Sequence, residues 1–117
     1  MIRLAFLSFL VVSTQPAAAE PLTGKELQKE LSGQTWAWTS KKSGTSGIST
    51  YFRDGQVIVQ LNGSGNRPQR GHWLVTEDQV CIAFIGNELN CSKDIVQIDD
   101  DTLFSESTET TYVRRDH

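Results

Sequence analysis

The sequence contains few of the residues that build catalytic or metal centres. Its 117 residues include two cysteines, two histidines and one methionine. The histidines, His72 and His117, are far apart and form no short ligand motif, so we expect no zinc site. No Gly-x-Ser-x-Gly segment supplies a hydrolase nucleophile. We therefore expect a protein that is not an enzyme and that needs no metal and no cofactor.

Strongly basic segments and long apolar runs are also missing. Lysine and arginine together number 11 against 14 acidic residues, which gives a net charge of −3. Phosphate backbones attract basic proteins, so we do not expect a nucleic-acid partner. Crossing a bilayer takes about 20 consecutive apolar residues, and no segment reaches that length. We expect one small domain without a membrane span, and a monomer.

The N-terminal segment has the three parts of a secretory signal peptide. Arg3 supplies a positive start, residues 4–12 are almost all apolar, and the segment ends in three alanines at 17–19. We predict that residues 1–19 are a signal peptide cleaved before Glu20. The alternative, a buried N-terminal helix, would not need the small-residue ending. The mature domain, residues 20–117, would then be periplasmic or secreted.

A short helix is predicted immediately before the first strand. Thr23 can cap it, and Glu26 three residues later completes a capping box. Leu27 and Leu31 share one face, and Gly33 is a typical helix stop. About two turns of helix are marginal alone in water, so the leucines must pack against the rest of the domain. The open end of a barrel would suit them.

From Gln34 onward the sequence alternates between apolar and polar residues, as strands do. We count seven or eight short strands joined by hairpin-length connections, which favours an antiparallel sandwich or small barrel over a parallel sheet. Closure into a barrel removes exposed strand edges. We therefore predict an all-β fold, a small antiparallel meander barrel with one short N-terminal helix.

The clearest hairpin signal is Asp54-Gly55, which lies between residues 48–53 and 56–61. A two-residue turn there pairs Phe52 with Val57 and makes one face of the hairpin apolar. The predicted inward residues on this face are Ile48, Thr50, Phe52, Val57, Val59 and Leu61.

The aromatic residues are expected to fill the core of so small a domain. A sugar-binding role is the alternative for the three tryptophans. The predicted core aromatics are Trp36, Trp38, Phe52, Trp73 and Phe84.

Cys81 and Cys91 are the only cysteines. An exported chain permits a disulfide, and a three-residue loop at 85–87 would place the two cysteines directly opposite each other. A two-residue turn at Gly86-Asn87 would instead pair Cys81 with Ser92 and would need a bulge. We favour a structural disulfide over free thiols or a redox-active pair, which would be favoured by Cys-x-x-Cys spacing.

Several short motifs occur in an order that resembles a known family. They are Leu22-Thr23-Gly24-x-x-Leu27, Leu31-Ser32-Gly33-x-x-Trp36, Asp54-Gly55, Gly71-x-Trp73-x-Val75, and Cys81 followed by Cys91. This order resembles the short exported proteins of alphaproteobacteria that carry a domain of unknown function. The resemblance covers almost the whole mature chain and implies a lipocalin-like barrel with one disulfide in the periplasm. It implies no activity.

True lipocalins are similar more loosely, because their first strand carries Gly-x-Trp after a short helix. Here Gly33 and Trp36 are separated by two residues, and the Gly-x-Trp of Gly71 and Trp73 falls in the middle of the chain. A small barrel can also be filled by its own side chains. An inherited cavity for a hydrophobic ligand therefore does not follow from the sequence.

We expect an exported, non-catalytic binding or accessory protein of the bacterial cell envelope. Its partner would be a protein, an envelope component or a small apolar ligand. The alternatives are a small hydrolase of envelope material that uses His72, and a structural or stress protein without a ligand. Loops on a rigid barrel often carry recognition, so we predict binding by the loops at 41–47 and 62–70. The candidate binding residues are Lys41, Lys42, Asn66, Arg67 and Arg70.

Overall fold

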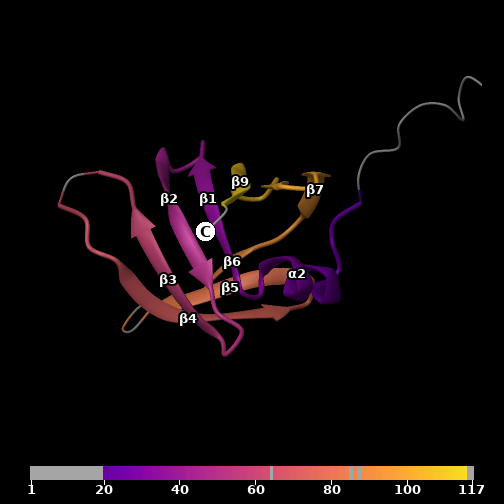
Figure 1. Cartoon of the computed structure of the whole chain (residues 1–117). Coiled ribbons are helices and arrows are strands. Elements are labelled where there is room, and N and C mark those ends of the chain that lie inside the picture. Colours follow the sequence, from indigo (N-terminus) through magenta and orange to yellow (C-terminus); the bar gives the residue numbers. More distant parts are fainter. Residues whose placement is uncertain (1–19, 64, 85, 87, 116–117) are drawn as a thin grey trace, which may run out of the picture.

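The computed structural model describes residues 20–63, 65–84, 86 and 88–115. Over these residues the chain forms one helix and an antiparallel sheet of nine strands, curled into a near-closed barrel (Figure 1). The all-β prediction is confirmed, with nine strands in place of the seven or eight expected. The predicted signal peptide lies outside the described residues. The elements are α2 (Gly24–Leu31), β1 (Gln34–Ser40), β2 (Thr45–Tyr51), β3 (Gln56–Leu61), β4 (Gln69–Thr76), β5 (Gln79–Phe84), β6 (Asn90–Ser92), β7 (Ile95–Asp99), β8 (Thr102–Ser105) and β9 (Thr110–Arg115).

The strands follow one another around the barrel as a meander. The hydrogen-bonded order is β6-β5-β4-β3-β2-β1-β9-β8-β7. β1 pairs with both β2 and β9, so the first and last strands lie side by side. The two ends of the sheet are β6 and β7, which are consecutive in the chain. The barrel therefore has a single seam, and only two residues connect its two sides.

The helix α2 begins with the predicted capping box. The backbone N–H of Glu26 donates to Thr23 Oγ1 over 3.2 Å, and the N–H of Thr23 donates to Glu26 Oε1 over 2.9 Å. Leu27 and Leu31 are buried, and the helix packs against β1, β4 and β5. It thus covers one end of the barrel with its apolar face, as its sequence pattern required.

The β4–β5 turn fixes the start of this helix. Glu77 and Asp78 both have positive φ, 49° and 60°, as the two central residues of a tight hairpin turn require. Thr76 pairs with Gln79 and closes the hairpin around them. Asp78 Oδ1 accepts a hydrogen bond of 2.6 Å from the N–H of Gly24, which is one of the unpaired donors of the first helical turn.

The predicted register of the β2–β3 hairpin is wrong by one residue. Tyr51, not Phe52, pairs with Val57, and Ser49 pairs with Val59. The reason is the loop length, because residues 53–55 form a three-residue loop. Gly55 closes it with φ 94° and donates its N–H to Phe52 O over 3.1 Å, as in a type I turn followed by a left-handed residue.

A shift of one residue moves every side chain of a strand to the other face. The inward residues of β2 are therefore Gly47, Ser49 and Tyr51, all of which are buried, while Ile48 and Thr50 face outward.

Phe52 is consequently not a core residue, which corrects the prediction. Its side chain is 39% exposed, and the residue contributes its carbonyl oxygen, which accepts the indole N–H of Trp73 over 2.8 Å. Trp73 itself is buried and contacts Tyr51 edge to face, with ring centres 5.3 Å apart. Trp36 is fully buried, whereas Trp38 and Phe84 are half-buried against the core.

Cys81 and Cys91 form a disulfide across the β5–β6 pair, where they are direct partners in the register. The predicted pairing is confirmed. Residues 85 and 87 of the intervening loop lie outside the described residues. β6 is only three residues long and pairs with β5 alone, so this bond fastens one side of the barrel seam.

On the β1–β9 side of the barrel, the side chain of Arg114 contacts the ring of Trp36. The guanidinium carbon of Arg114 lies 4.5 Å from the centre of the Trp36 ring. Its Nη2 reaches Glu30 Oε1 on α2 over 2.6 Å, and its Nε lies 3.4 Å from Asp101 Oδ1. The backbone N–H of Arg114 also donates to Asp101 O over 2.8 Å. One side chain thereby connects β1, β9, α2 and the β7–β8 turn.

The disulfide should carry a substantial share of the stability. In the chain-entropy view, a loop of this size contributes about 2–3 kcal/mol. We expect the double variant Cys81→Ala/Cys91→Ala to lose about that much free energy of unfolding, measured by urea denaturation. Thiol labelling of the denatured, non-reduced wild type is the control, and it should modify neither cysteine. Extensive labelling, or an unchanged urea midpoint, would contradict the assignment.

Arg114 offers a second test with a neighbour as its matched control. Cation–π contacts and partly buried ion pairs each contribute up to about 1–2 kcal/mol. We expect Arg114→Ala to lower the free energy of unfolding by roughly 1–3 kcal/mol. Arg115 is exposed and faces outward, so Arg115→Ala should change it by less than about 0.5 kcal/mol. Equal losses in the two variants would show that the stack over Trp36 has no special role.

Candidate ligand cavity

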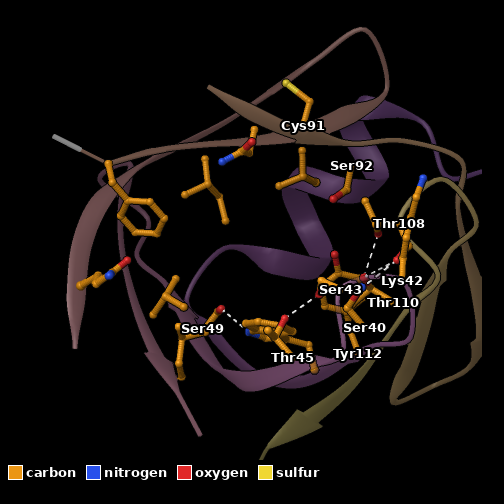
Figure 2. Close-up of a pocket in the computed structure, with 18 of the residues that line it drawn as sticks. Ser40, Lys42, Ser43, Thr45, Ser49, Cys91, Ser92, Thr108, Thr110 and Tyr112 are labelled. Carbon is orange, nitrogen blue, oxygen red and sulfur yellow. Dashed lines mark hydrogen bonds between the residues drawn. The ribbon is translucent and has the colours of Figure 1, made fainter. Parts of the chain in front are cut away.

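The barrel is hollow in the half away from α2. A cavity of about 570 Å³ lies inside it and is open to solvent (Figure 2). Below it, between the cavity and the helix, only about 10 Å³ of space remains among the side chains of Leu31, Ile95, Leu103 and their neighbours. The prediction left open whether the interior is filled or hollow. The structure shows a filled end beneath the helix and a hollow end opposite it.

One wall of the cavity is apolar. β3 contributes Val59 and Leu61, and β5 contributes Val80, Ile82 and Phe84. These residues alternate along their strands with outward-facing ones, as the pleat dictates. Aliphatic and aromatic surface of this kind gains free energy when a ligand displaces water from it.

The opposite wall consists of hydroxyl groups that already have hydrogen-bond partners within the protein. Ser40 Oγ donates to Thr108 O over 3.1 Å, and Thr110 Oγ1 lies 2.8 Å from Thr108 Oγ1. Ser43 Oγ and Thr45 Oγ1 are 2.6 Å apart. Figure 2 shows these side chains gathered on one side of the cavity. Because the hydrogen bonds exist before any ligand enters, the polar wall is preorganised.

Two glycines make room for aromatic rings along the walls. A Cβ atom at Gly47 would lie 2.6 Å from Gln60 O and 3.0 Å from the Trp38 ring. A Cβ atom at Gly71 would lie 2.5 Å from Ala83 O. The indole of Trp38 therefore lies directly against the backbone of β2, where its N–H donates to Ser49 Oγ over 2.8 Å. Glycine inside a strand often marks such a close approach.

Tyr51 and Tyr112 bring two phenol groups to the cavity. Burial raises the pKa of Tyr51 far above its usual value, Tyr112 nearby raises it further, and hydrogen bonding with Ser49 acts in the opposite direction. Burial also raises the pKa of Tyr112, against the effect of hydrogen bonds with Ser92, Thr108 and Thr110. Both groups stay neutral at physiological pH and add hydrogen-bonding capacity without charge.

Among the described residues that line the cavity, one carries a charge. Lys42, in the β1–β2 turn, is the one ionisable residue besides the tyrosines among the described residues that line the cavity. Its Nζ donates to Ser107 O over 3.4 Å. Carboxylates are absent from that same set of lining residues.

Of the five residues predicted to bind, the structure brings Lys42 to the cavity. Lys41, its neighbour, is exposed and is not in the lining. Asn66 stabilises its own loop by donating to Asn62 O over 2.9 Å, and Arg67 is exposed in that loop. Arg70 is not a loop residue, because β4 begins at Gln69. Arg70 is exposed and lies outside the lining, whereas its neighbour Gln69 lines the cavity.

The loop boundaries are corrected in the same way. The segment predicted as a loop at 41–47 is a short turn, because Thr45–Gly47 already belongs to β2. The loop between β3 and β4 joins two lining residues, Leu61 and Gln69, so it stands at the rim of the cavity.

The remaining polar residues considered for chemistry lie elsewhere. His72 is exposed on β4 and does not line the cavity. The acidic residues of the β7–β8 turn, at 99–101, also lie outside the lining, and Asp101 pairs with Arg114. In the described part of the chain, no group of three or more His, Cys, Asp and Glu side chains is placed to hold a metal ion.

No protein-family model matches this chain, and no curated protein or solved structure matches it either. Across the residues described, no helix is both long and apolar enough to cross a bilayer. The resemblance to exported alphaproteobacterial proteins stays a prediction.

Most of the cavity residues were not predicted from the sequence. Ser40, Ser49 and Thr110 are buried small polar residues on strands, and they alternate with outward-facing neighbours. A run of small polar residues at inward positions is the signal that could have indicated a hollow interior, because a filled barrel needs bulk there.

The two tyrosines, which are the only ones in the sequence, give a test of the cavity's interior. In the unfolded chain they should ionise near pH 10, whereas in the fold they should stay neutral beyond that value. Because the folded-state pKa values are raised, this contribution to stability is fully present below pH 10 and is lost as the pH rises above it. Ultraviolet titration of phenolate should therefore show ionisation only with unfolding. A reversible native transition near pH 10 would contradict this.

Proposed function

We propose that this protein is an exported, non-catalytic binding protein that holds a small ligand inside its barrel. The cavity is the observation that carries this proposal. Small-molecule sites are concave, mostly apolar, and usually 300–1,000 Å³ in volume, and the volume of about 570 Å³ lies within that range. An apolar wall facing a wall of hydroxyl groups suits a ligand that has both apolar and polar parts.

The hollow interior favours binding over a purely structural role. Unfilled space inside a fold costs stability because the lining side chains lose contacts. In this barrel the space results from small residues at inward positions, such as Ser40, Ser49 and Thr110. A ligand would restore the missing contacts, whereas a structural protein gains nothing from the space.

The disulfide supports an oxidising compartment, since such bonds are rare in reducing cytosol. Together with the predicted signal peptide, it supports a periplasmic or secreted location. The rim of the cavity, including the loop that carries Arg67, is then the surface available to a protein or an envelope component.

Nothing at the site favours the hydrolase alternative. A hydrolase of the kind considered needs His72 within a cleft beside a buried carboxylate. His72 is instead exposed on β4 and does not line the cavity.

Blocking the cavity mouth should abolish uptake of an apolar probe. We expect N-phenyl-1-naphthylamine, a neutral fluorophore, to bind the wild type with increased fluorescence. Gln69 is exposed at the mouth and lines the cavity, so Gln69→Trp adds bulk there without disturbing the core. We expect it to weaken binding by about tenfold or more, which corresponds to about 1.4 kcal/mol.

The matched control is Arg70→Trp, one residue along the same strand and outside the lining. It should bind the probe as the wild type does. Circular dichroism should show that both variants keep the fold. The proposal fails if the wild type takes up no probe, or if Gln69→Trp binds as tightly as Arg70→Trp.

A further inference from the structure

The distribution of charge around the cavity indicates which class of ligand it accepts. This inference rests on the proposed function, because it concerns the ligand of the same cavity. The lining holds one cation, Lys42, and no carboxylate among its described residues. The two ionisable groups deeper inside, Tyr51 and Tyr112, are kept neutral by burial. The cavity is thus positive at its mouth and uncharged within.

The position of Lys42 is fixed by a tight turn. The N–H of Gly44 donates to Ser40 O over 3.0 Å, and the N–H of Ser43 donates to Ser40 Oγ over 3.3 Å. Gly44 has φ 72°, which a residue with a side chain would adopt only at a cost. The lysine therefore projects from a defined backbone beside the hydroxyl wall, as Figure 2 shows.

The ammonium group of Lys42 keeps unused hydrogen-bonding capacity. It has three N–H donors, and its one contact is the long bond to Ser107 O. Glu106 and Glu109 belong to the neighbouring β8–β9 connection, yet no ion pair with Lys42 forms among the described residues. An arriving anion would find both a charge and free donors at this point.

The hydroxyl groups beside Lys42 can add further donors. In the pair Ser43 and Thr45, one hydroxyl donates to the other, which leaves the second proton of the pair free. Thr108 Oγ1 accepts from Thr110 and its hydroxyl is engaged with Tyr112, so the free donor beside Lys42 comes from the Ser43 and Thr45 pair. Neutral donors next to a cation are the combination that binds carboxylates and related acids.

The apolar wall runs inward from this polar mouth. Leu61 and Phe84 lie near the loops, and Val59 and Val80 lie deeper along the same strands. A ligand with its acid group at Lys42 would place its apolar part along this wall. A cationic head group would meet Lys42 and would find no carboxylate in the described lining to pair with.

We propose that the ligand is an amphipathic anion, with an acid group held at the mouth by Lys42 and the hydroxyl pair of Ser43 and Thr45, and an apolar body against β3 and β5. The acid group selects the class, and the apolar body supplies most of the affinity through burial.

Three probes with the same alkyl chain separate the contribution of the head group. They are decanoate, 1-decanol and decylammonium, and their binding to the full chain can be measured by titration calorimetry at neutral pH. We expect decanoate to bind at least about threefold more tightly than 1-decanol, which is the scale of a partly exposed ion pair. Decylammonium should bind more weakly than either.

Two adjacent lysines provide the variant and its control. Lys42→Gln should remove the preference for decanoate over 1-decanol, while the affinity for 1-decanol stays unchanged. Lys41→Gln makes the same change in net charge at a residue outside the lining, and it should keep the wild-type preference.

The outcomes distinguish the two proposals. If all three probes bind equally, or if decylammonium binds best, the ligand class is wrong while the binding function stands. If Lys41→Gln and Lys42→Gln lose the preference equally, general surface charge is responsible and the proposed acid site is overturned. If none of the probes binds, and N-phenyl-1-naphthylamine is not taken up, the proposed function fails and this inference fails with it.

Discussion

The stack of Arg114 on Trp36 is the contact on which the rest of the barrel depends. β1 and β9 are adjacent strands, so this contact joins the beginning of the barrel to its end. The ion pair with Glu30 extends the junction to α2. A meander can close only if its first and last strands meet, and a buried tryptophan under a paired arginine makes that meeting specific. The helix then finds a complete apolar floor for Leu27 and Leu31.

Side chains packed at one end of the barrel stabilise the fold, so the other end can be hollow. Most of the buried apolar side chains lie near the helix, where they supply the hydrophobic free energy of folding. The other half of the barrel is held differently, by strand pairing, a network of serine and threonine hydroxyls, and the disulfide on the short edge strand β6. Cys81 neighbours two lining residues, Val80 and Ile82, so alternation places it on the face away from the cavity. Cys91 itself belongs to the cavity lining, and Figure 2 shows it at one wall. The covalent bond thus stiffens a wall of the cavity.

Local signals in the sequence predicted the parts of the fold that depend on local chemistry. The capping box of Thr23 and Glu26 and the Cys81–Cys91 pairing are both present. The β2–β3 register was wrong because it assumed that the more apolar face turns inward. Alternation with the buried Ser49 and Tyr51 instead turns Ile48 and Phe52 outward. Asp54-Gly55 also fits both a two-residue and a three-residue loop, so the turn alone did not decide the register. A cavity depends on contacts between distant strands, which a single sequence does not reveal.

On β1 and β9, inward-facing residues two positions apart have different roles, because one stabilises the fold and the next lines the cavity. Trp36 is buried at the filled end of β1, while Trp38 and Ser40 line the cavity. On β9, Arg114 belongs to the junction with α2, while Tyr112 and Thr110 line the cavity. Along the barrel axis, the inward residues nearest α2 therefore pack in the core, and the next ones line the cavity. Because distant sites usually contribute independently to stability, lining residues at the mouth can change without loosening the Trp36 junction. A barrel built in this way can vary its ligand while keeping its fold.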